Sequence, residues 1–331
     1  MKASQEHPLV SIQCMVYNHE PYLRQCLDGF VMQRTNFKFE AIVHDDVSTD
    51  GSAAIIREYA EKYPDIIKPI YETENQYSKK DGSLDRIMRE ACNGKYIAIC
   101  EGDDYWIDPL KLQKQVDFME ANPEYALCHT GFKIYNDDEG ILVDCDDIIK
   151  RNSEQYHSNQ DIMERILDGT YYRIQTVTTL FRMSSYSKVN NLLKSFEGKF
   201  LMGDTQLWIS LLSVGNIFFL PEITSVYRIH AGSSCRPVSF QSKIHFDLSC
   251  AEMRVVMADV FNLSNKLKRK LQSQYQKKLN LYLTYVPNYK LIVQIKYNNF
   301  FECIRFNILR LPIIRNLLLY IYSRKNRHNE L

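Results

Sequence analysis

Three acidic side chains follow one apolar run near the middle of the chain. The run YIAI at residues 96–99 is followed by Cys-Glu-Gly-Asp-Asp, which brings Glu101, Asp103 and Asp104 close together in sequence. Adjacent carboxylates repel each other unless a cation lies between them, and carboxylate oxygens are ligands that Mg²⁺ and Mn²⁺ prefer. An Asp-Asp pair alone more often belongs to a solvated turn or a helix cap. The position of this pair, directly after an apolar run, favours a divalent-cation site.

The same arrangement occurs twice earlier in the chain. Residues 9–16 (LVSIQCMV) and 39–44 (FEAIVH) are apolar runs of strand length, followed by Tyr17 and by the pair Asp45 and Asp46. Strands that alternate with helices form a parallel sheet, and ligands bind at the carboxyl ends of its strands. If the predicted strands are neighbours, we expect the polar residues that follow them to share one rim of the sheet.

The elements that must position these residues show clear end signals. A helix is predicted after Asp108, with Asp108 as its N-cap, Pro109 in the first position and Pro123 beyond its end. Gly203 and Asp204 open another predicted helix, which reaches residue 214. Further strands are predicted at residues 66–71, 95–100, 125–130, 175–182, 217–220 and 223–229, and further helices at 21–31, 55–63 and 83–92.

The composition is that of a protein with a full-sized core. The chain has 331 residues, 45% of them hydrophobic and 24% charged, so we expect one large domain and an appendage. Nine cysteines are scattered along the chain without a Cys-x-x-Cys pair, and several lie inside apolar runs. This pattern predicts reduced thiols in the core and argues against a disulfide framework or a zinc ribbon.

The first residues, MKASQEHPLVSIQ, contain no long apolar stretch. We therefore expect neither a secretory signal peptide nor an N-terminal anchor. Together with the cysteine pattern, this predicts a protein that stays in the cytoplasm.

Charge is distributed unevenly along the chain. Residues 261–331 contain 14 Lys/Arg and 2 Asp/Glu, a net charge of +12, whereas residues 1–260 contain 27 Lys/Arg and 38 Asp/Glu, a net charge of −11. The basic segment carries no nucleic-acid-binding motif, so nucleic acid is not an expected partner. Within it, residues 300–327 (FFECIRFNILRLPIIRNLLLYIYSRKNR), which we call the basic tail, alternate apolar clusters with Arg and Lys.

The basic tail is a candidate for binding to a membrane surface. None of its uncharged stretches reaches the roughly 18 residues of a membrane-spanning helix. We expect instead a helix in the plane of an anionic leaflet, with its cations at the lipid headgroups and its apolar side chains inserted. The alternative is that the tail packs on the catalytic domain or on a partner subunit.

Three segments in a fixed order carry a resemblance to a known family. They are PLVSIQCMVYNHEPYL, then FEAIVHDDVSTDGS, then NGKYIAICEGDDYWIDPLKLQKQVDFMEANPEY. Over roughly the first two-thirds of its length, the chain is similar to the family-2 glycosyltransferases, inverting enzymes of the GT-A fold. The resemblance implies an α/β nucleotide-sugar-binding fold, with a mostly parallel central sheet flanked by helices. It places the catalytic domain at residues 1–235 and leaves 236–331 as a helical, basic extension that is a candidate for membrane association.

The resemblance also implies a reaction and its partners. The donor would be a nucleotide sugar, with a UDP-sugar favoured, and a divalent cation, Mn²⁺ or Mg²⁺, would assist direct displacement at the anomeric carbon. A glycan or lipid-linked acceptor in polysaccharide biosynthesis would fit the basic tail, and the enzyme would then work at the cytoplasmic face of a membrane. The donor sugar is not implied, because Met15, Val16 and Val47 depart from residues common in relatives.

Four residues match the donor-binding elements of the family. Tyr17 matches the residue that packs on the nucleotide base, and Asp46 the residue that accepts a hydrogen bond from the base. Asp103 and Asp104 match the D-x-D-like element. In this resemblance Asp104 holds the metal that bridges the diphosphate, while Asp103 contacts the ribose or the metal shell.

Two residues in the second half of the chain match the rest of the family's site. Asp204 matches the general base that deprotonates the acceptor hydroxyl, although Gly203 stands where many relatives carry an acid. His230, in the segment YRIHAGSS, matches a histidine that completes the metal shell in some members. The simpler alternatives are that Asp204 only caps its helix and that His230 is a hydrogen-bonded loop residue.

Two other classes of function stay open on the sequence alone. A nucleotidyltransferase also binds nucleotides on an α/β sheet, but it needs a Gly-rich phosphate loop after the first strand, and residues 17–20 (YNHE) supply none. A non-catalytic, membrane-associated scaffold would be favoured if Asp104 or Asp204 were absent, and both are present. A dehydrogenase is disfavoured, because no G-x-G-x-x-G follows the first strand.

Overall fold

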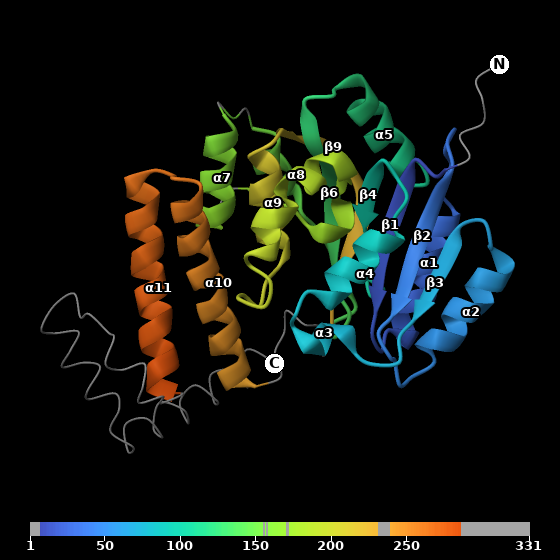
Figure 1. Cartoon of the computed structure of the whole chain (residues 1–331), viewed down its shortest axis with the longest axis horizontal. Helices are drawn as coiled ribbons and strands as arrows, with labels where there is room; N and C mark the ends of the chain where they lie inside the picture. The colour runs from blue at the N-terminus through green and yellow to red at the C-terminus, as the bar shows by residue number, and fades with distance from the viewer. Residues whose placement is uncertain (1–6, 155, 157, 170–171, 231–238, 286–331) are drawn as a thin grey trace, which may run out of the picture. The chain divides into compact units, whose positions relative to one another are not determined.

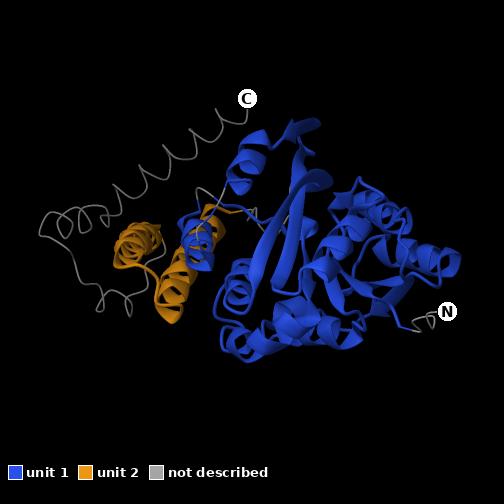
Figure 2. Ribbon diagram, turned by 90° about the horizontal axis from the view of Figure 1, so that it is seen from above, with its two compact units in different colours: residues 1–233 blue, residues 234–331 orange. Residues whose placement is uncertain are grey.

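The computed structural model describes residues 7–154, 156, 158–169, 172–230 and 239–285. The chain divides into two compact units, residues 1–233 and 234–331, which are coloured separately in Figure 2. Every strand among the described residues belongs to the first unit, and the described part of the second unit is helical.

The first half of the large unit is a parallel sheet. Strands β1 (Val10–Val16), β2 (Phe39–Asp45), β3 (Ile67–Tyr71) and β4 (Tyr96–Ile99) lie in the order β3-β2-β1-β4, and every neighbouring pair is parallel (Figure 1). The three central strands β2, β1 and β4 are almost continuously buried, which explains their long apolar runs. The predicted parallel arrangement is confirmed for these strands.

Helices connect the parallel strands, as the periodicity predicts. They are α1 (Glu20–Val31), α2 (Ser52–Lys62), α3 (Gln76–Lys79) and α4 (Ser83–Ala91). The buried face of α1 follows the three-and-four spacing of one helix side, because only that side reaches the sheet. Its members are Leu23, Cys26, Leu27, Gly29 and Phe30.

Beyond β4 the sheet is mixed. Strand β8 (Leu180–Arg182) is antiparallel to β4 and to β6 (Tyr125–Asn136), whereas β9 (Asn216–Ile229) is parallel to β6. The short β5 (Tyr105–Trp106) lies at the end of the sheet, antiparallel to β9, and β7 (Ile141–Asp144) forms a hairpin with β6. The predicted mostly parallel sheet therefore holds for β1 to β4, whereas the rest of the sheet is mixed. Sequence reasoning missed the mixed part because hydrophobic periodicity does not encode strand direction.

Three predicted boundaries differ from the structure. Strand β6 continues six residues past the predicted end, to Asn136, because it pairs along its length with β9. The two runs predicted on either side of Pro221 form the single strand β9, with irregular register against β6 near Gly131. Only the end of the predicted strand 175–182 is a strand, since Thr176–Thr178 form a 3₁₀ turn.

The described residues of the large unit form five further helices: α5 (Lys111–Ala121), α6 (Asp146–Asn152), α7 (Asn159–Asp168), α8 (Met183–Lys194) and α9 (Asp204–Leu212). The prediction of Asp108 as the N-cap of α5 is wrong, since the cap position is Leu110. Asp108 lies two residues upstream, where its Oδ1 accepts a hydrogen bond of 2.8 Å from the backbone N–H of Leu110. The carboxylate thus closes a turn before the helix instead of capping it.

The described part of the second unit is a pair of long helices, α10 (Phe240–Val260) and α11 (Asn265–Tyr285), which pack against each other. Among the residues that the structure describes, no helix is long and apolar enough to cross a bilayer. The basic tail, residues 300–327, lies outside the described residues, so its predicted membrane helix stays a prediction.

Candidate active site

The acidic residues after β4 form one cluster. Glu101, Asp103 and Asp104 lie between β4 and β5, and each offers a carboxylate oxygen within 4.8 Å of the oxygens of the other two. Burial raises the pKa of Glu101 to about 8, helped by the charges of Asp103 and Asp204. Sequence reasoning assigned Glu101 no role beyond its acidity, although its position two residues before Asp103 was the available signal.

A glycine separates the first two acids for a steric reason. A Cβ at Gly102 would lie 2.7 Å from Nδ1 of His19 and 3.0 Å from Cγ2 of Val16, so no side chain fits there. His19 therefore packs against the loop at residues 100–104, which we call the acidic loop. Its Nδ1 is buried without a hydrogen-bond partner among the described residues. Burial lowers the pKa of His19, partly opposed by the charge of Asp103. Sequence reasoning missed His19, because a lone histidine in a turn carries no specific signal.

His230, which the resemblance assigns to the metal shell, contacts the acidic cluster. Its Nε2 lies 3.0 Å from Oδ2 of Asp103, and its ring packs at a centroid distance of 4.6 Å on Tyr22 from α1. Burial by itself raises the pKa of Asp103, but the hydrogen bond from His230 and the charges of the two nearby histidines leave that pKa below its usual range. Asp103 is therefore held as a carboxylate.

Asp104 is the most buried member of the cluster. Its side chain is 2% exposed, and its Oδ1 accepts a hydrogen bond of 2.8 Å from the backbone N–H of Arg228 in β9. Burial and the neighbouring carboxylates Asp103 and Glu101 raise its pKa well above the usual range. One oxygen of Asp104 thus anchors β9, while the side chain as a whole stays within the cluster.

The Arg228 side chain connects the cluster to three other elements. Its Nε donates to the backbone oxygen of Asp103 at 2.9 Å, one terminal nitrogen to Asp137 Oδ1 at 3.1 Å, and the other to Gln25 Oε1 at 2.6 Å. The guanidinium carbon lies within 5.2 Å of three aromatic ring centroids, which favours the charged group at a buried position. These rings belong to Tyr22, Tyr105 and Tyr135.

The side chains in the cluster fit a divalent cation. Three carboxylates supply hard oxygen ligands within reach of one another, and the imidazole of His230 lies beside them. A cation would also relieve the repulsion that raises the pKa values of Glu101 and Asp104. The structure thus brings together Asp103, Asp104 and His230 of the predicted site and adds Glu101 to them.

Asp204 is the first residue of α9. Gly203 occupies the N-cap position without a side-chain cap, and Asp204 Oδ1 accepts a hydrogen bond of 2.6 Å from the backbone N–H of Thr205. Burial raises the pKa of Asp204, and the hydrogen bonds from Thr205 oppose the rise. Because the charge of Asp204 also raises the pKa of Glu101, the two carboxylates lie within electrostatic reach of each other.

Tyr17 and Asp46 lie side by side on the same rim. The backbone N–H of Asp46 donates a hydrogen bond of 2.9 Å to the carbonyl oxygen of Val16, so the residues that follow β1 and β2 are adjacent. The Tyr17 side chain is 50% exposed, so its ring is accessible to a ligand on the rim. The rim predicted from the strand ends is present.

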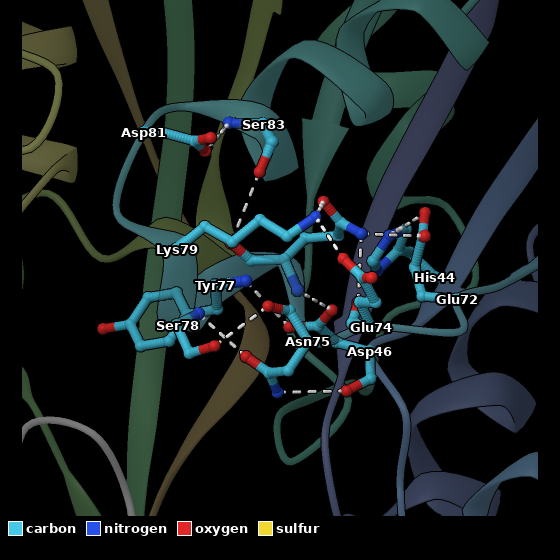
Figure 3. Close-up of polar contacts among 11 residues, drawn as sticks. His44, Asp46, Glu72, Glu74, Asn75, Tyr77, Ser78, Lys79, Asp81 and Ser83 are labelled. Atoms are coloured by element: carbon cyan, nitrogen blue, oxygen red, sulfur yellow. Dashed lines mark hydrogen bonds and ion pairs between the residues drawn. The ribbon is translucent and has the colours of Figure 1, made fainter.

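The carboxylate of Asp46 anchors the short helix α3 (Figure 3). Its Oδ1 accepts from the backbone N–H of Gln76 at 2.6 Å and its Oδ2 from that of Tyr77 at 3.0 Å, while Asn75 donates to its backbone oxygen. Asp46 is only 3% exposed, so both oxygens already have partners. To accept a hydrogen bond from a nucleotide base, a carboxylate oxygen of Asp46 would have to use a second lone pair or lose its hydrogen bond to α3. The predicted role of Asp46 in binding the base stays a prediction.

The neighbouring Asp45 was given no role by the sequence. It is 4% exposed, and its Oδ1 is buried without a hydrogen-bond partner among the described residues. A buried carboxylate oxygen that lacks a partner carries a desolvation cost that a donor group would offset. Asp45 is therefore a second candidate, beside Asp46, for contact with an N–H group of a ligand.

A polar network ties α3 to β2 (Figure 3). Nε2 of His44 lies 3.2 Å from Oε1 of Glu72, whose second oxygen accepts from Gln76 at 3.0 Å. Lys79 in turn contacts Oε1 of Gln76 at 3.1 Å and Oε2 of Glu74 at 3.0 Å. The network fixes the segment after β3 beside the rim, so that α3 does not depend on its own four residues for stability.

Comparisons with known proteins identify the family of the chain. Residues 11–190 match the family model described as glycosyl transferase family 2. An uncharacterized protein of Mycobacterium tuberculosis (strain ATCC 25618 / H37Rv) is 35% identical over 228 residues, which cover 67% of this chain and 59% of that protein. The alignment thus spans somewhat over half the length of this relative.

Two solved structures share the fold at low sequence identity. The S. aureus TarS 1–349 structure in complex with UDP-GlcNAc aligns with a TM-score of 0.54 and 16% identity, covering 90% of this chain and 79% of that one. The mannosyltransferase PcManGT from Pyrobaculum calidifontis, in complex with GDP-Man and Mn²⁺, aligns with a TM-score of 0.53 and 14% identity, covering 88% and 79%. With its GT-A fold and a family match over more than half of its length, the chain belongs to glycosyl transferase family 2.

Proposed function

We propose that this chain transfers a sugar from a nucleotide-diphosphate donor to a hydroxyl group of a glycan or lipid-linked acceptor, with inversion at the anomeric carbon. A UDP-sugar is the favoured donor. The observation that carries the proposal is the cluster of Glu101, Asp103 and Asp104 with His230 against it, on the rim that also holds Tyr17. The solved relatives support it, because one is a complex with UDP-GlcNAc and the other with GDP-Man and Mn²⁺.

The acidic cluster would hold the diphosphate side of the donor. Asp103, Asp104 and His230 would bind a divalent cation, Mn²⁺ or Mg²⁺, with Glu101 beside them. When bound, the cation supplies positive charge that stabilises the leaving nucleoside diphosphate. The hydrogen bonds from Arg228 and His230 keep the acids in place before the donor arrives, so little reorganisation is needed.

The base of the nucleotide would bind at the other end of the rim. Tyr17 offers an exposed ring for stacking, and Asp46 or the unpaired oxygen of Asp45 offers an acceptor for an N–H group of the base. This part of the site would select the nucleotide, because the hydrogen-bond pattern differs between bases.

Asp204 would act as the general base. A carboxylate accepts the proton of the acceptor hydroxyl as the oxygen attacks the anomeric carbon, and the nucleoside diphosphate leaves from the opposite face. Burial raises the pKa of Asp204, which makes its carboxylate a stronger base than an exposed one. The charge of Asp204 raises the pKa of Glu101, which supports a position of Asp204 near the acidic cluster.

The acceptor and the location of the enzyme remain part of the proposal. A lipid-linked acceptor would place the chain at the cytoplasmic face of a membrane, bound peripherally through the basic tail, residues 300–327. The charge of this tail is the support, since its net positive sign suits an anionic leaflet.

A thermal-shift panel tests the donor site. UDP-, GDP-, dTDP- and CMP-sugars are added with and without Mn²⁺ to the native chain, to Asp104→Asn and to the control Asp117→Asn on the outer side of α5. We expect one nucleotide family to raise the melting temperature only with Mn²⁺, because a ligand at a hundred times its Kd stabilises a fold by about 2.7 kcal/mol. The shift should disappear in Asp104→Asn and persist in the control. No shift with any donor contradicts the proposal.

The Asp204→Asn variant tests the general base separately. We expect donor binding to be unchanged and transfer to fall by about 10²- to 10⁴-fold, because an amide cannot accept the proton. Transfer at the native rate would show that another group is the base, while the donor site would remain supported.

A further inference from the structure

The backbone of His19 is fixed at the start of α1. His19 is the N-cap residue of this helix, and its carbonyl oxygen accepts hydrogen bonds of 2.9 Å from the backbone N–H groups of Tyr22 and Leu23. Its own backbone N–H donates to Oγ of Ser52 at 2.9 Å. These hydrogen bonds hold His19 in the turn that follows Tyr17, so its imidazole ring is attached at a fixed point beside the rim.

One ring nitrogen of His19 faces an apolar space. A Cβ placed on Gly102 would lie 2.7 Å from Nδ1 of His19. The same Cβ would lie 3.0 Å from Cγ2 of Val16 and 3.4 Å from Cδ1 of Leu23, and neither methyl group can accept a hydrogen bond. A proton on Nδ1 would therefore be a buried donor without an acceptor among the described residues, which is rare and costly in proteins. We accordingly assign the proton of the neutral ring to Nε2.

The other ring nitrogen, Nε2, is accessible. It makes no hydrogen bond with a described residue, and it is not one of the buried atoms that lack a partner, so it reaches the surface. The side chain lies beside the acidic loop, because burial lowers the pKa of His19 and the charge of Asp103 opposes this effect. Nε2–H is thus a hydrogen-bond donor available to a ligand on the rim.

The position of His19 suits the middle of a nucleotide-sugar donor. Tyr17, two residues upstream, is proposed to stack on the base, and Asp103 and Asp104 are proposed to hold the cation of the diphosphate. The ribose and its phosphates connect these two parts of the donor. We propose that Nε2–H of His19 donates a hydrogen bond to a phosphate oxygen of the donor. Such an oxygen is charged, and hydrogen bonds to charged groups are about twice as strong as neutral ones.

A neutral imidazole fits this place beside a cation site. Because burial lowers the pKa of His19, its ring carries no charge at neutral pH and does not repel the cation, as a lysine or arginine would. A role as a further metal ligand does not fit. A histidine that binds a metal through Nε2 donates its Nδ1–H to a partner, and Nδ1 of His19 has none among the described residues.

The inference rests on the proposed donor site and names a further residue of it. Two variants of similar side-chain length isolate the N–H group: His19→Met removes it, whereas His19→Gln keeps one near the end of the side chain. The His19 side chain makes no capping hydrogen bond to α1, so neither variant removes a cap and both should melt within a few degrees of the native chain.

Calorimetric titration of the full chain with UDP and with GDP, each in the presence of Mn²⁺, tests the proposal. Uridine and Mn²⁺ alone are the probes that lack a phosphate. We expect His19→Met to bind the nucleoside diphosphate about 10- to 100-fold more weakly than the native chain, which is the usual loss for a hydrogen bond to a charged group. His19→Gln should recover most of that affinity. Uridine and Mn²⁺ alone should bind all three proteins alike.

Three results would overturn the proposal and leave the donor site supported. His19→Met could bind the diphosphate as tightly as the native chain does. It could lose uridine to the same extent, which would place the contact on the ribose or the base. Both variants could lose Mn²⁺ alone, which would make His19 a metal ligand. A native chain that binds neither UDP nor GDP would overturn this inference together with the proposed function.

Discussion

The backbone N–H of Arg228 donates a hydrogen bond of 2.8 Å to Oδ1 of the buried Asp104, and the Arg228 side chain holds the backbone oxygen of Asp103. One residue of β9 therefore positions both acids of the loop after β4. The acidic loop depends on a strand that is more than a hundred residues away in sequence.

Replacing Arg228 should loosen the acidic loop. Arg228→Met removes the hydrogen bonds to Asp137, Gln25 and the backbone oxygen of Asp103, and since Asp137 is one third exposed and keeps its hydrogen bond from Tyr22, we expect a loss of about 1–3 kcal/mol of unfolding free energy. We expect Mn²⁺-dependent donor binding to weaken at least tenfold as well, measured by calorimetry beside urea unfolding. Arg228→Lys should weaken binding too, because an ammonium does not reach three acceptors in fixed directions.

Arg24→Met is the matched control for this variant. Arg24 lies in the same helix as Gln25, and its ion pair with Glu58 is more than half exposed. We expect less than about 1 kcal/mol of destabilisation and unchanged donor binding. Equal effects of the two variants would contradict the positioning role of Arg228.

Removing the Asp46 carboxylate should release α3. Asp46→Ala leaves the backbone N–H groups of Gln76 and Tyr77 without acceptors, a loss of about 1–3 kcal/mol. Hydrogen exchange of these two amides should accelerate in the absence of any nucleotide. Asp81→Ala removes a similar side-chain hydrogen bond, to Ser83, from an exposed position and should leave both amides unchanged. Slow exchange in Asp46→Ala would show that the remaining network holds α3 without the carboxylate.

Lys111 should make stability depend on pH. It is fully buried, it donates to Gln115 at 2.6 Å, and burial lowers its pKa to about 7 from an ordinary value of 10.5. Between these values the folded chain has released a proton that the unfolded chain still holds, so unfolding takes up a proton. The free energy of unfolding should therefore rise with pH, by about 1.4 kcal/mol per unit from Lys111 alone.

Urea unfolding between pH 7.5 and 9.5 measures this slope. We expect it to be shallower in Lys111→Met by about that amount, because methionine fills similar volume and does not titrate. A control with Lys114→Met, whose partly exposed ammonium pairs with Asp108, should keep the native slope. Identical slopes in the native chain and Lys111→Met would show that Lys111 does not change its charge in this range.

Three cysteines beneath the acidic loop should resist alkylation. The sulfur of Cys26 lies 4.0 Å from that of Cys14 and 3.9 Å from that of Cys100, and all three side chains are fully buried. Burial raises the pKa of Cys26 and Cys100, so little thiolate forms at neutral pH. Brief iodoacetamide treatment followed by peptide mapping should leave these positions unmodified in the native chain and modified in urea. Rapid native modification would mean that the loop opens.

The sequence predicted most of the parallel part of the sheet, which carries the proposed donor site. Apolar runs and polar strand ends located β1, β2 and β4 and the rim that carries Tyr17, Asp46 and the acidic loop, because parallel strands bring their carboxyl ends together. The family resemblance added His230 as an expected metal ligand. Its contact with Asp103 is a finding of the structure, and no local sequence pattern contains it, since the two residues lie 127 positions apart.

The remaining features depend on contacts that sequence patterns do not record. The buried hydrogen bonds of Asp46 to α3 need the position of a four-residue helix that has no periodicity of its own. Likewise, the aromatic surroundings of Arg228 come from three separate elements. The direction of the strands after β4 could not be predicted either, because an antiparallel strand and a parallel one can share the same apolar pattern.

Asp204 and His230 stand at the two ends of one continuous segment, in which α9 leads through a short turn into β9. Tyr17, Asp46 and the acidic loop all precede residue 105. A chimera that exchanges residues 204–230 with a relative would thus graft the proposed base together with the histidine and leave the nucleotide side intact. The exchanged segment also contains Arg228. The acidic loop would therefore be held by the relative's residue at position 228, together with the relative's proposed acceptor-binding residues.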